Sequence, residues 1–314
     1  MENNRPDKLD FDIIRQLRED GRRPAKTIAQ ALGVTEATVT SRIHALSDAS
    51  VMRVMAQRNV EHLRTRLFCF IRVWIRGRSA EVVADDIAAF AGAGSVMMMM
   101  GSPEIHVTAL VEDNDDLLAL LQDHIGQVSG VDRLDVSMTL KAYKYRYDVV
   151  SLSPALSLGE PQGDPLDDDI IRQLQIDGRI SNREIGRVLG ISASTIRERV
   201  NRMLTTRQIR IGAVCDYRSM GFEIAAIAYL QVAAAQFKAA LDYLVAQNEI
   251  GQVSAISGPS NIFVILSGRN LDHLSEIVRN KLQTVPGVIK TSVSLVAKPK
   301  KHRADLISLV EPPG

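Results

Sequence analysis

The chain repeats itself at a constant spacing, and this repeat constrains its fold more than any other feature. The segment LDFDIIRQLREDGR begins at Leu9, and LDDDIIRQLQIDGR begins at Leu166. The same offset pairs Gly101 with Gly258 far downstream and Lys141 with Lys298. Because the register is unbroken from residue 9 to residue 141, we expect two tandem copies of one whole folding unit.

Each copy begins with a pattern typical of a helix-turn-helix. Apolar residues recur at helical spacing from the start of the copy, which predicts a first helix that ends near a glycine. A second predicted helix ends at Gly33 or Gly190, where a tight turn favours positive φ. Thr35 or Ser192 then stands at the N-cap position of a third helix. Two helices joined by a glycine-containing turn are the hallmark of this motif.

The exposed positions around the third helix predict a DNA interface. Short hydroxyls and arginines in the N-terminal half of such a helix suit the major groove and its phosphates. We therefore expect contacts to double-stranded DNA from Thr35, Thr38, Thr40, Ser41, Arg42 and His44 in the first copy, and from Ser192, Ser194, Thr195, Arg197, Arg199 and Arg202 in the second. The alternative is a solvated helix face, but both copies retain the glycine, the cap and an arginine, which favours DNA binding.

The second part of each copy predicts a small α/β domain. After a short strand that follows the third helix, apolar strand-like and helix-like segments alternate in the order βαββαβ, and the final strand of the first copy covers residues 131–140. This order is typical of a ferredoxin-like sheet with its helices on one face. The fold class is therefore α+β, with two tandem units that each join a winged-type helix-turn-helix domain to a ferredoxin-like regulatory domain.

Domain boundaries follow from the repeat and from a segment rich in Pro and Gly between the copies. We expect a helix-turn-helix domain over residues 1–60, a regulatory domain over 61–145, a linker over 146–164, the second helix-turn-helix domain over 165–217, the second regulatory domain over 218–305 and a tail over 306–314.

Several functional classes receive no support from the sequence. No nucleophile elbow, P-loop, dinucleotide fingerprint or paired metal-ligand motif is present, so we expect no enzyme activity, cofactor or bound metal. The run Met97–Met100 could offer sulfur ligands, but packing of a strand between the copies explains it better. The two cysteines, a polar N-terminus and the absence of a membrane-spanning apolar run predict a cytoplasmic protein that does not contact membranes. The net charge of +1 requires any DNA surface to come from local clustering.

These residues resemble the Lrp/AsnC family of leucine- and asparagine-responsive regulators. The resemblance rests on LDxDIIRQL, DGR, LGV/LGI, TEATVTSRI, SASTIRERV and the βαββαβ unit, and it covers nearly the whole chain twice. It implies DNA binding, regulatory domains that pair through their sheets, homo-oligomers and often an amino acid bound between regulatory domains. The glycine that usually closes the family's third helix is replaced here by Ser50 and Arg207.

The family's effector loop also differs in this chain. Where the family tends to have Gly-x-Tyr-Asp, the first copy has Gly101, Ser102, Pro103 and Glu104, and the second has Gly258, Pro259, Ser260 and Asn261. We expect an amino-acid-like effector to contact Gly101, Ser102, Glu104, Gly258, Ser260 and Asn261, with Glu104 able to pair an amine and Asn261 not. The alternative is that neither loop binds a ligand.

Three functions remain open at this point. The first is a sequence-specific transcription regulator that reads an asymmetric operator, since the copies differ where bases would be contacted. The second is an enzyme similar to siroheme decarboxylases, although the stretches 95–101 and 252–258 lack the His and Tyr that such a resemblance requires. The third is a ligand sensor without DNA binding. The sequence does not decide whether the two sheets pair within one chain or between chains.

Overall fold

A computed structural model describes residues 6–59, 62, 67–145, 149–150 and 163–307. The chain divides into two compact units, each of which contains parts of both copies. The helix-turn-helix unit comprises Met1–Leu63, Tyr147–Gly221 and Arg303–Leu309. The barrel unit comprises Arg64–Arg146, Phe222–His302 and Val310–Gly314. Like domains of the two copies are thus grouped together, although they are separated in sequence.

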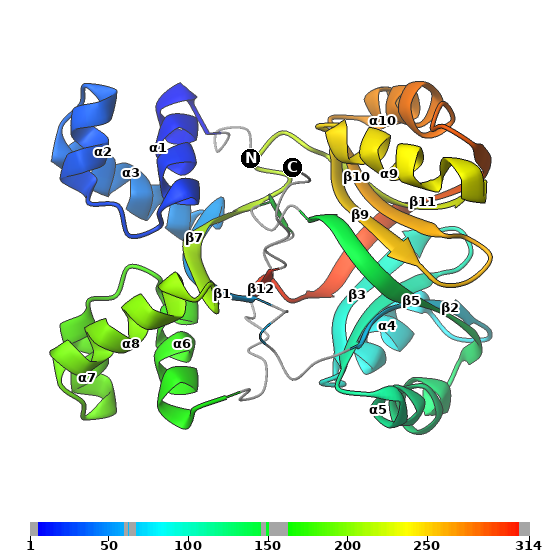
Figure 1. Cartoon of the computed structure of the whole chain (residues 1–314), viewed down its shortest axis with the longest axis horizontal. Coiled ribbons are helices and arrows are strands. Elements are labelled where there is room, and N and C mark those ends of the chain that lie inside the picture. The colour runs from blue at the N-terminus through cyan, green and yellow to red at the C-terminus, as the bar shows by residue number, and fades with distance from the viewer. Residues whose placement is uncertain (1–5, 60–61, 63–66, 146–148, 151–162, 308–314) are drawn as a thin grey trace. The chain divides into compact units, whose positions relative to one another are not determined.

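The helix-turn-helix unit contains two three-helix bundles (Figure 1). Its helices are α1 (Lys8–Glu19), α2 (Ala25–Leu32) and α3 (Glu36–Asp48), followed in the second copy by α6 (Pro165–Ile176), α7 (Asn182–Leu189) and α8 (Ala193–Thr205). Gly33 and Gly190 close α2 and α7 with φ of 68° and 70°, as the sequence predicts. Each third helix turns an apolar face inward through Val39, Ile43 and Leu46 or through Ile196, Val200 and Met203.

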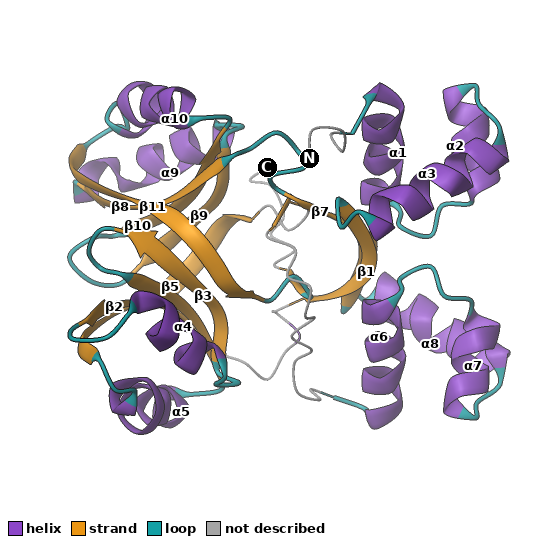
Figure 2. Cartoon of the chain, turned by 180° about the vertical axis from the view of Figure 1, so that it is seen from behind, coloured by secondary structure: helices purple, strands orange, loops and turns teal. Residues whose placement is uncertain are grey.

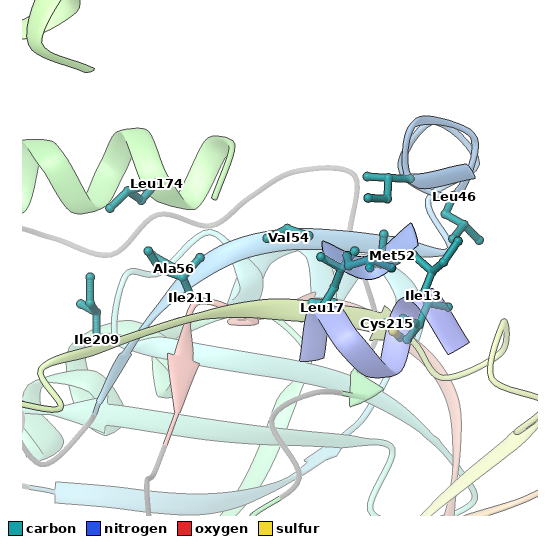
Figure 3. Close-up of a cluster of buried hydrophobic side chains, with 14 of the residues drawn as sticks. Ile13, Leu17, Leu46, Met52, Val54, Ala56, Leu174, Ile209, Ile211 and Cys215 are labelled. Carbon is teal, nitrogen blue, oxygen red and sulfur yellow. The ribbon is translucent and has the colours of Figure 1, made fainter. Parts of the chain in front are cut away.

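Two strands join the bundles across a local pseudo-twofold axis. The strand β1 (Met52–Asn59) runs antiparallel to β7 (Ile209–Asp216), and the short strands β12 (Leu306–Ile307) and β6 (Val149–Val150) flank this pair in parallel. Each central strand packs against the first helix of the other copy, α6 on β1 and α1 on β7. Figure 3 shows the shared apolar core, in which Leu17, Leu174, Val54 and Ile211 come from both copies. The two helix-turn-helix domains therefore fold as one body.

Two glycines allow this close packing. The Gly21 amide donates to the Ile211 carbonyl at 3.1 Å, and the Gly178 amide donates to the Val54 carbonyl at 2.9 Å. A Cβ on Gly21 would lie 2.9 Å from the Gly212 backbone, and one on Gly178 would lie 2.9 Å from the backbone nitrogen of Met55. The DGR turns of the two copies are thus pressed against the opposite copy's strand.

The barrel unit is built from two ferredoxin-like halves, as Figure 2 shows. The first half contains β2 (Leu67–Ile75), α4 (Ala80–Ala88), β3 (Ala93–Met100), β4 (Ile105–Val111), α5 (Asn114–Ala119) and β5 (Val131–Tyr145). The second contains β8 (Ile224–Val232), α9 (Phe237–Ala246), β9 (Ile250–Ile256), β10 (Ile262–Gly268), α10 (Leu271–Ile277) and β11 (Val288–His302). A π-helical turn continues both α5 and α10.

The two half-sheets close into one barrel with the strand order β10-β8-β11-β3-β4-β2-β5-β9. The joins are β5 with β9 and β11 with β3, so the sheets pair within one chain. Side chains alternate along each strand between two cores. In β2, Cys69 and Ile71 face the outer helices, while Phe70 faces the apolar cluster that Met99 and Phe263 share inside the barrel.

The final strand of each half is longer than the sequence predicts. Instead of ending at residue 140, β5 continues to Tyr145. Its first part pairs with β2 of its own copy, and the part from Thr139 onward pairs with β9 of the other copy. The extension has its partner in the second copy, which a local pattern of alternating residues cannot reveal.

Candidate DNA interface and ligand-binding elements

The N-caps of both third helices form as predicted. The Thr38 amide donates to the Thr35 hydroxyl at 3.1 Å, and the Thr195 amide donates to the Ser192 hydroxyl at the same distance. The same cap hydroxyls also form side-chain hydrogen bonds: the Thr35 hydroxyl lies 2.8 Å from the Thr38 hydroxyl, and the Ser192 hydroxyl lies 2.8 Å from the Thr195 hydroxyl. These residues satisfy the first backbone donors of the helix, which fixes where each third helix begins.

Two of the predicted DNA-contacting arginines hold the bundles together. Arg42 Nη1 lies 2.8 Å from Asp7 and 3.2 Å from Asp10 at the start of α1. Arg199 Nη1 lies 2.7 Å from Asp164 and 2.9 Å from Asp167 at the start of α6. The charge of Asp10, followed by the hydrogen bond that Arg42 donates to Asp7, raises the pKa of Arg42. These ion pairs fasten the third helix of each copy to its first.

The neighbouring Arg202 also pairs with Asp167, and the hydrogen bond that Arg199 donates to Asp167 raises the pKa of Arg199. The second copy therefore places two arginines on one acidic residue, where the first copy places one. The repeated Asp at the start of the first helix was visible in the sequence, but its pairing with the third helix was not predicted.

The remaining predicted contacts are exposed. Thr40, Ser41 and His44 on α3 and Ser194 and Arg197 on α8 all face solvent. Within the described part of the chain, Arg197 forms no hydrogen bond or ion pair, so its guanidinium is available to a ligand. The position equivalent to Arg197 in the first copy holds Thr40, so this exposed position carries a positive charge in the second copy only.

The contact between the DGR turns was missed by sequence reasoning. Arg22 donates to the Ile180 carbonyl at 2.7 Å and to Asn182, while Arg179 donates to the Gly21 carbonyl at 2.7 Å and to the Arg23 carbonyl. Burial lowers the pKa of Arg22 and of Arg179. The signal was the exact repetition of Asp-Gly-Arg in both copies, since these residues meet across the pseudo-twofold axis.

The second copy's first helix carries a buried ion pair that the first copy lacks. Arg58 on β1 lies 2.5 Å from Asp168 on α6, and both side chains are almost fully enclosed. The equivalent residues are Cys215 and Phe11. The two bundles are therefore attached to the central strands by different chemistry.

The predicted effector loops lie at the ends of strands in the barrel unit. A carboxylate oxygen of Glu104 accepts from the Ile75 amide at 3.2 Å. The Asn261 side chain makes two bonds with Val232, accepting from its amide at 2.9 Å and donating to its carbonyl at 2.8 Å. Gly101 and Gly258 have positive φ, of 103° and 110°. Ser102 precedes a cis proline, and Ser260 lies within the second loop. Both loops thus use the Glu or Asn side chain to hold a neighbouring strand end.

A buried polar cluster lies inside the barrel, between the two halves. His106 Nε2 is 2.9 Å from the Tyr229 hydroxyl, and the Arg72 guanidinium lies 4.7 Å from the Tyr229 ring centroid. Arg72 also pairs with Asp135 at 2.6 Å. Burial, with a smaller contribution from the charge of Arg72, lowers the pKa of His106 to about 3. His106 is therefore neutral in the folded protein at ordinary pH.

The described residues contain no group of three or more His, Cys, Asp or Glu side chains that could hold a metal ion. The Met97–Met100 run forms the end of β3 and pairs with β11 of the other copy. Met99 contributes to the barrel's inner core, and Met97 packs against it. In the part of the chain that the structure describes, no helix is long and apolar enough to cross a membrane.

These features define a class of protein: a tandem helix-turn-helix protein whose two α/β domains close into one barrel. The AsnC-type helix-turn-helix domain model matches residues 7–47 and 164–204, and the Lrp/AsnC ligand binding domain model matches residues 68–149 and 225–306. The chain belongs to the Lrp/AsnC family of helix-turn-helix transcriptional regulators.

Similar proteins support the same family. An uncharacterised HTH-type transcriptional regulator of Pyrococcus furiosus is 33% identical over 139 residues, which are 44% of this chain and 94% of the relative. The HTH-type transcriptional regulator Ptr1 of Methanocaldococcus jannaschii is 32% identical over 137 residues, which are 43% of this chain and 92% of the relative. One copy of this chain thus corresponds to nearly the whole length of each relative.

Solved structures of the siroheme decarboxylase NirDL match this chain over both copies. The crystal structure of the siroheme decarboxylase NirDL matches with a TM-score of 0.68 at 14% sequence identity, and the match covers 96% of this chain and 95% of that chain. At this identity the likeness concerns the fold alone. It shows that the tandem helix-turn-helix and ferredoxin-like architecture is shared with a protein named as an enzyme.

Proposed function

We propose that the chain is a sequence-specific DNA-binding regulator whose two copies read unequal half-sites of one operator. The observation that carries this proposal is the joining of two capped third helices into a single body through β1 and β7. Paired helix-turn-helix domains usually read two half-sites, and a symmetric pair reads a palindrome. This pair presents Thr40 and His44 on one side and Arg197 and Asn201 on the other, so its operator is asymmetric.

The test is a binding selection from genomic fragments with the full chain, read by sequencing at two salt concentrations. An enriched, non-palindromic site whose occupancy falls steeply with salt is the expected outcome, because phosphate contacts release counterions. Enrichment of a palindrome would contradict the unequal half-sites. Failure to enrich any site would remove the regulator function and favour a ligand sensor.

Arg197 provides the sharpest single-residue test of unequal reading. Arg197→Ala should weaken operator binding and reduce the magnitude of the salt slope by about 1, since one phosphate contact is lost. His44→Ala should leave the salt slope unchanged. Lys238→Ala, an exposed charge removed from α9 in the barrel unit, is the control and should change neither quantity. Equal slopes for the Arg197 and His44 variants would contradict the proposal. Arg42, Arg199 and Arg202 are less informative because their ion pairs hold the bundles.

The regulatory role of the barrel unit is part of the proposal. We infer that an amino-acid-like effector would use the loop with Glu104, since Asn261 is committed to Val232. Glu104 retains one carboxylate oxygen beyond its bond to Ile75, and this oxygen suits an amine. Homo-oligomers and a cytoplasmic location belong to the same proposal.

A second candidate function rests on the whole-chain likeness to NirDL. A tetrapyrrole substrate would give this chain a haem-type absorption band on mixing. Appearance of such a band with conversion of the tetrapyrrole would favour an enzyme, and its absence together with an enriched DNA site would leave the regulator.

A further inference from the structure

A cavity of about 470 Å³ lies within the helix-turn-helix unit, where the first copy's third helix faces the second copy's DGR turn. Its lining is mixed, with apolar surface from Ile43, Met52, Val54 and Ile176 and nearly as much from polar atoms. Ligand sites for small molecules commonly have this size and a mainly apolar lining with a few polar groups. The DNA-facing role proposed for α3 does not require such a hollow.

The polar groups of this cavity carry an excess of positive charge. Arg53 and Arg179 line it together with Asp177, and His44, Thr40 and Ser47 approach from α3. Arg53 is partly buried, and among the described residues no hydrogen bond or ion pair holds its guanidinium. Arg179 is bonded to backbone carbonyls, and the carboxylates that act on its charge are Asp177 and Asp20, of which Asp177 lines the cavity. A partly buried arginine without an anionic partner is costly, which favours an anion from solution.

The equivalent place in the second copy is built differently. Arg210, the counterpart of Arg53, donates to the Arg18 carbonyl and to Gln57 at 3.4 Å, so its guanidinium is engaged. Leu204 replaces Ser47 and Glu19 replaces Ile176, which adds bulk and a negative charge. Among the described residues, an arginine without a partner and the exposed Ile176 thus occur together in the first copy's cavity.

We propose that this cavity binds a small organic carboxylate with a compact apolar body, with Arg53 pairing the carboxylate and Ile176 and Met52 contacting the body. A DNA phosphate offers the same anionic chemistry but has no apolar part. The apolar side chains of the lining therefore favour the organic carboxylate. Because Thr40 and His44 lie on the third helix, an occupied cavity covers side chains proposed to contact DNA. This regulatory consequence, unlike the binding itself, rests on the proposed function.

The test measures thermal stabilisation of the full chain by a panel of aryl and alkyl carboxylates, each compared with its neutral amide. Indole-3-acetate and indole-3-acetamide are one such pair. A ligand that binds only the folded state raises Tm in proportion to its affinity. We expect at least one acid to raise Tm with saturation while its amide does not. If no carboxylate of the panel raises Tm, or if acids and amides act equally, the proposal is wrong.

Three variants locate the effect. Arg53→Gln should weaken binding of the acid at least tenfold, as expected for loss of a charge-assisted pair. Ile176→Glu, which installs the first copy's residue at an exposed position, should abolish binding by repulsion. Arg183→Gln removes an exposed arginine of α7 outside the cavity and should leave binding of the acid unchanged. Equal affinity in Arg53→Gln and the unaltered chain would overturn the assignment.

A separate measurement addresses the link to DNA. At saturating acid the operator should dissociate from the unaltered chain and stay bound to Ile176→Glu. Retention of the operator by the unaltered chain would overturn the regulatory consequence. A chain that binds no DNA but still shows the Arg53-dependent Tm shift would retain the ligand site while the proposed function fails.

Discussion

At the scale of single residues, Ser50 and Arg207 show how the chain departs from its family without losing the fold. Both have positive φ, 55° and 56°, directly after the third helix of their copy. The Val51 amide then bonds to the Leu46 carbonyl at 3.0 Å, as in a helix end that a glycine would normally close. A side chain at such a position costs about 1 kcal/mol relative to glycine.

Ser50→Gly should therefore raise the free energy of unfolding by about 1 kcal/mol, measured by urea denaturation. Ser41→Gly, placed inside α3 where φ is ordinary, should lower it by about 0.5–1 kcal/mol. Opposite signs for these two serine-to-glycine changes are the expected result. A loss of stability in Ser50→Gly would contradict the strain at this position.

His106 predicts a dependence of stability on pH. Its pKa is about 3 in the folded protein, well below its ordinary value, because burial disfavours the charged ring. Between about pH 6.5 and pH 3, His106 is protonated in the unfolded chain but stays neutral in the folded chain. The free energy of unfolding therefore falls as the pH is lowered. In the His106→Phe/Tyr229→Phe double variant, the free energy of unfolding should fall less steeply than in the unaltered chain, by up to about 1.4 kcal/mol per pH unit in this range. If the free energy of unfolding falls by the same amount in both proteins between pH 7.5 and pH 4.5, this role of His106 is refuted.

At the scale of elements, the strands β1 and β7 determine how the helix bundles meet. Gly178→Ala should lower the free energy of unfolding by about 1–3 kcal/mol, because its Cβ would press on the Met55 backbone nitrogen. Gly163→Ala, where nothing lies within 4 Å of a new Cβ, is the matched control and should change stability little. Calorimetric unfolding of both variants distinguishes a specific clash from the general effect of adding a methyl group.

Local patterns predicted most elements correctly and missed what depends on the other copy. The caps at Thr35 and Ser192 and the turns at Gly33 and Gly190 follow from backbone requirements that act within a few residues. The extension of β5 to Tyr145 and the contact of Arg179 with Gly21 require partners more than a hundred residues away. The ion pairs of Arg42 and Arg199 were unforeseen for a different reason, because their partners lie in the same copy but at the start of another helix.

At the scale of the whole molecule, the barrel interior distinguishes the two copies from each other. Arg72 and Tyr229 occupy equivalent positions and contact each other, and so do His106 and Phe263, whose ring centroids lie 5.6 Å apart. If two first copies paired, Arg72 would meet a second Arg72 inside the barrel. Each Arg72 would keep its own Asp135, but the two guanidinium groups would face and repel each other, which favours pairing of unlike copies.

Tyr229→Arg imitates the symmetric pairing and should lower the free energy of unfolding by more than about 3 kcal/mol, because it buries two facing guanidinium groups. Tyr229→Phe removes the bond to His106 and should cost about 1 kcal/mol. Chemical denaturation of the two variants measures the difference. Equal losses would mean that the arginine escapes to solvent and that charge does not select the pairing.

The contact between unlike counterparts in the barrel also bears on how such a protein can evolve. In an assembly of identical chains, every substitution near the axis appears twice and faces itself, so His106 could enter only opposite another histidine. Fusion of the copies into one gene removes this restriction, because each side of the axis then has its own codon. The pairs Arg72 with Tyr229 and His106 with Phe263 are combinations that a symmetric dimer of identical chains cannot contain, and once they are fixed, the first half cannot form such a dimer without placing Arg72 opposite itself.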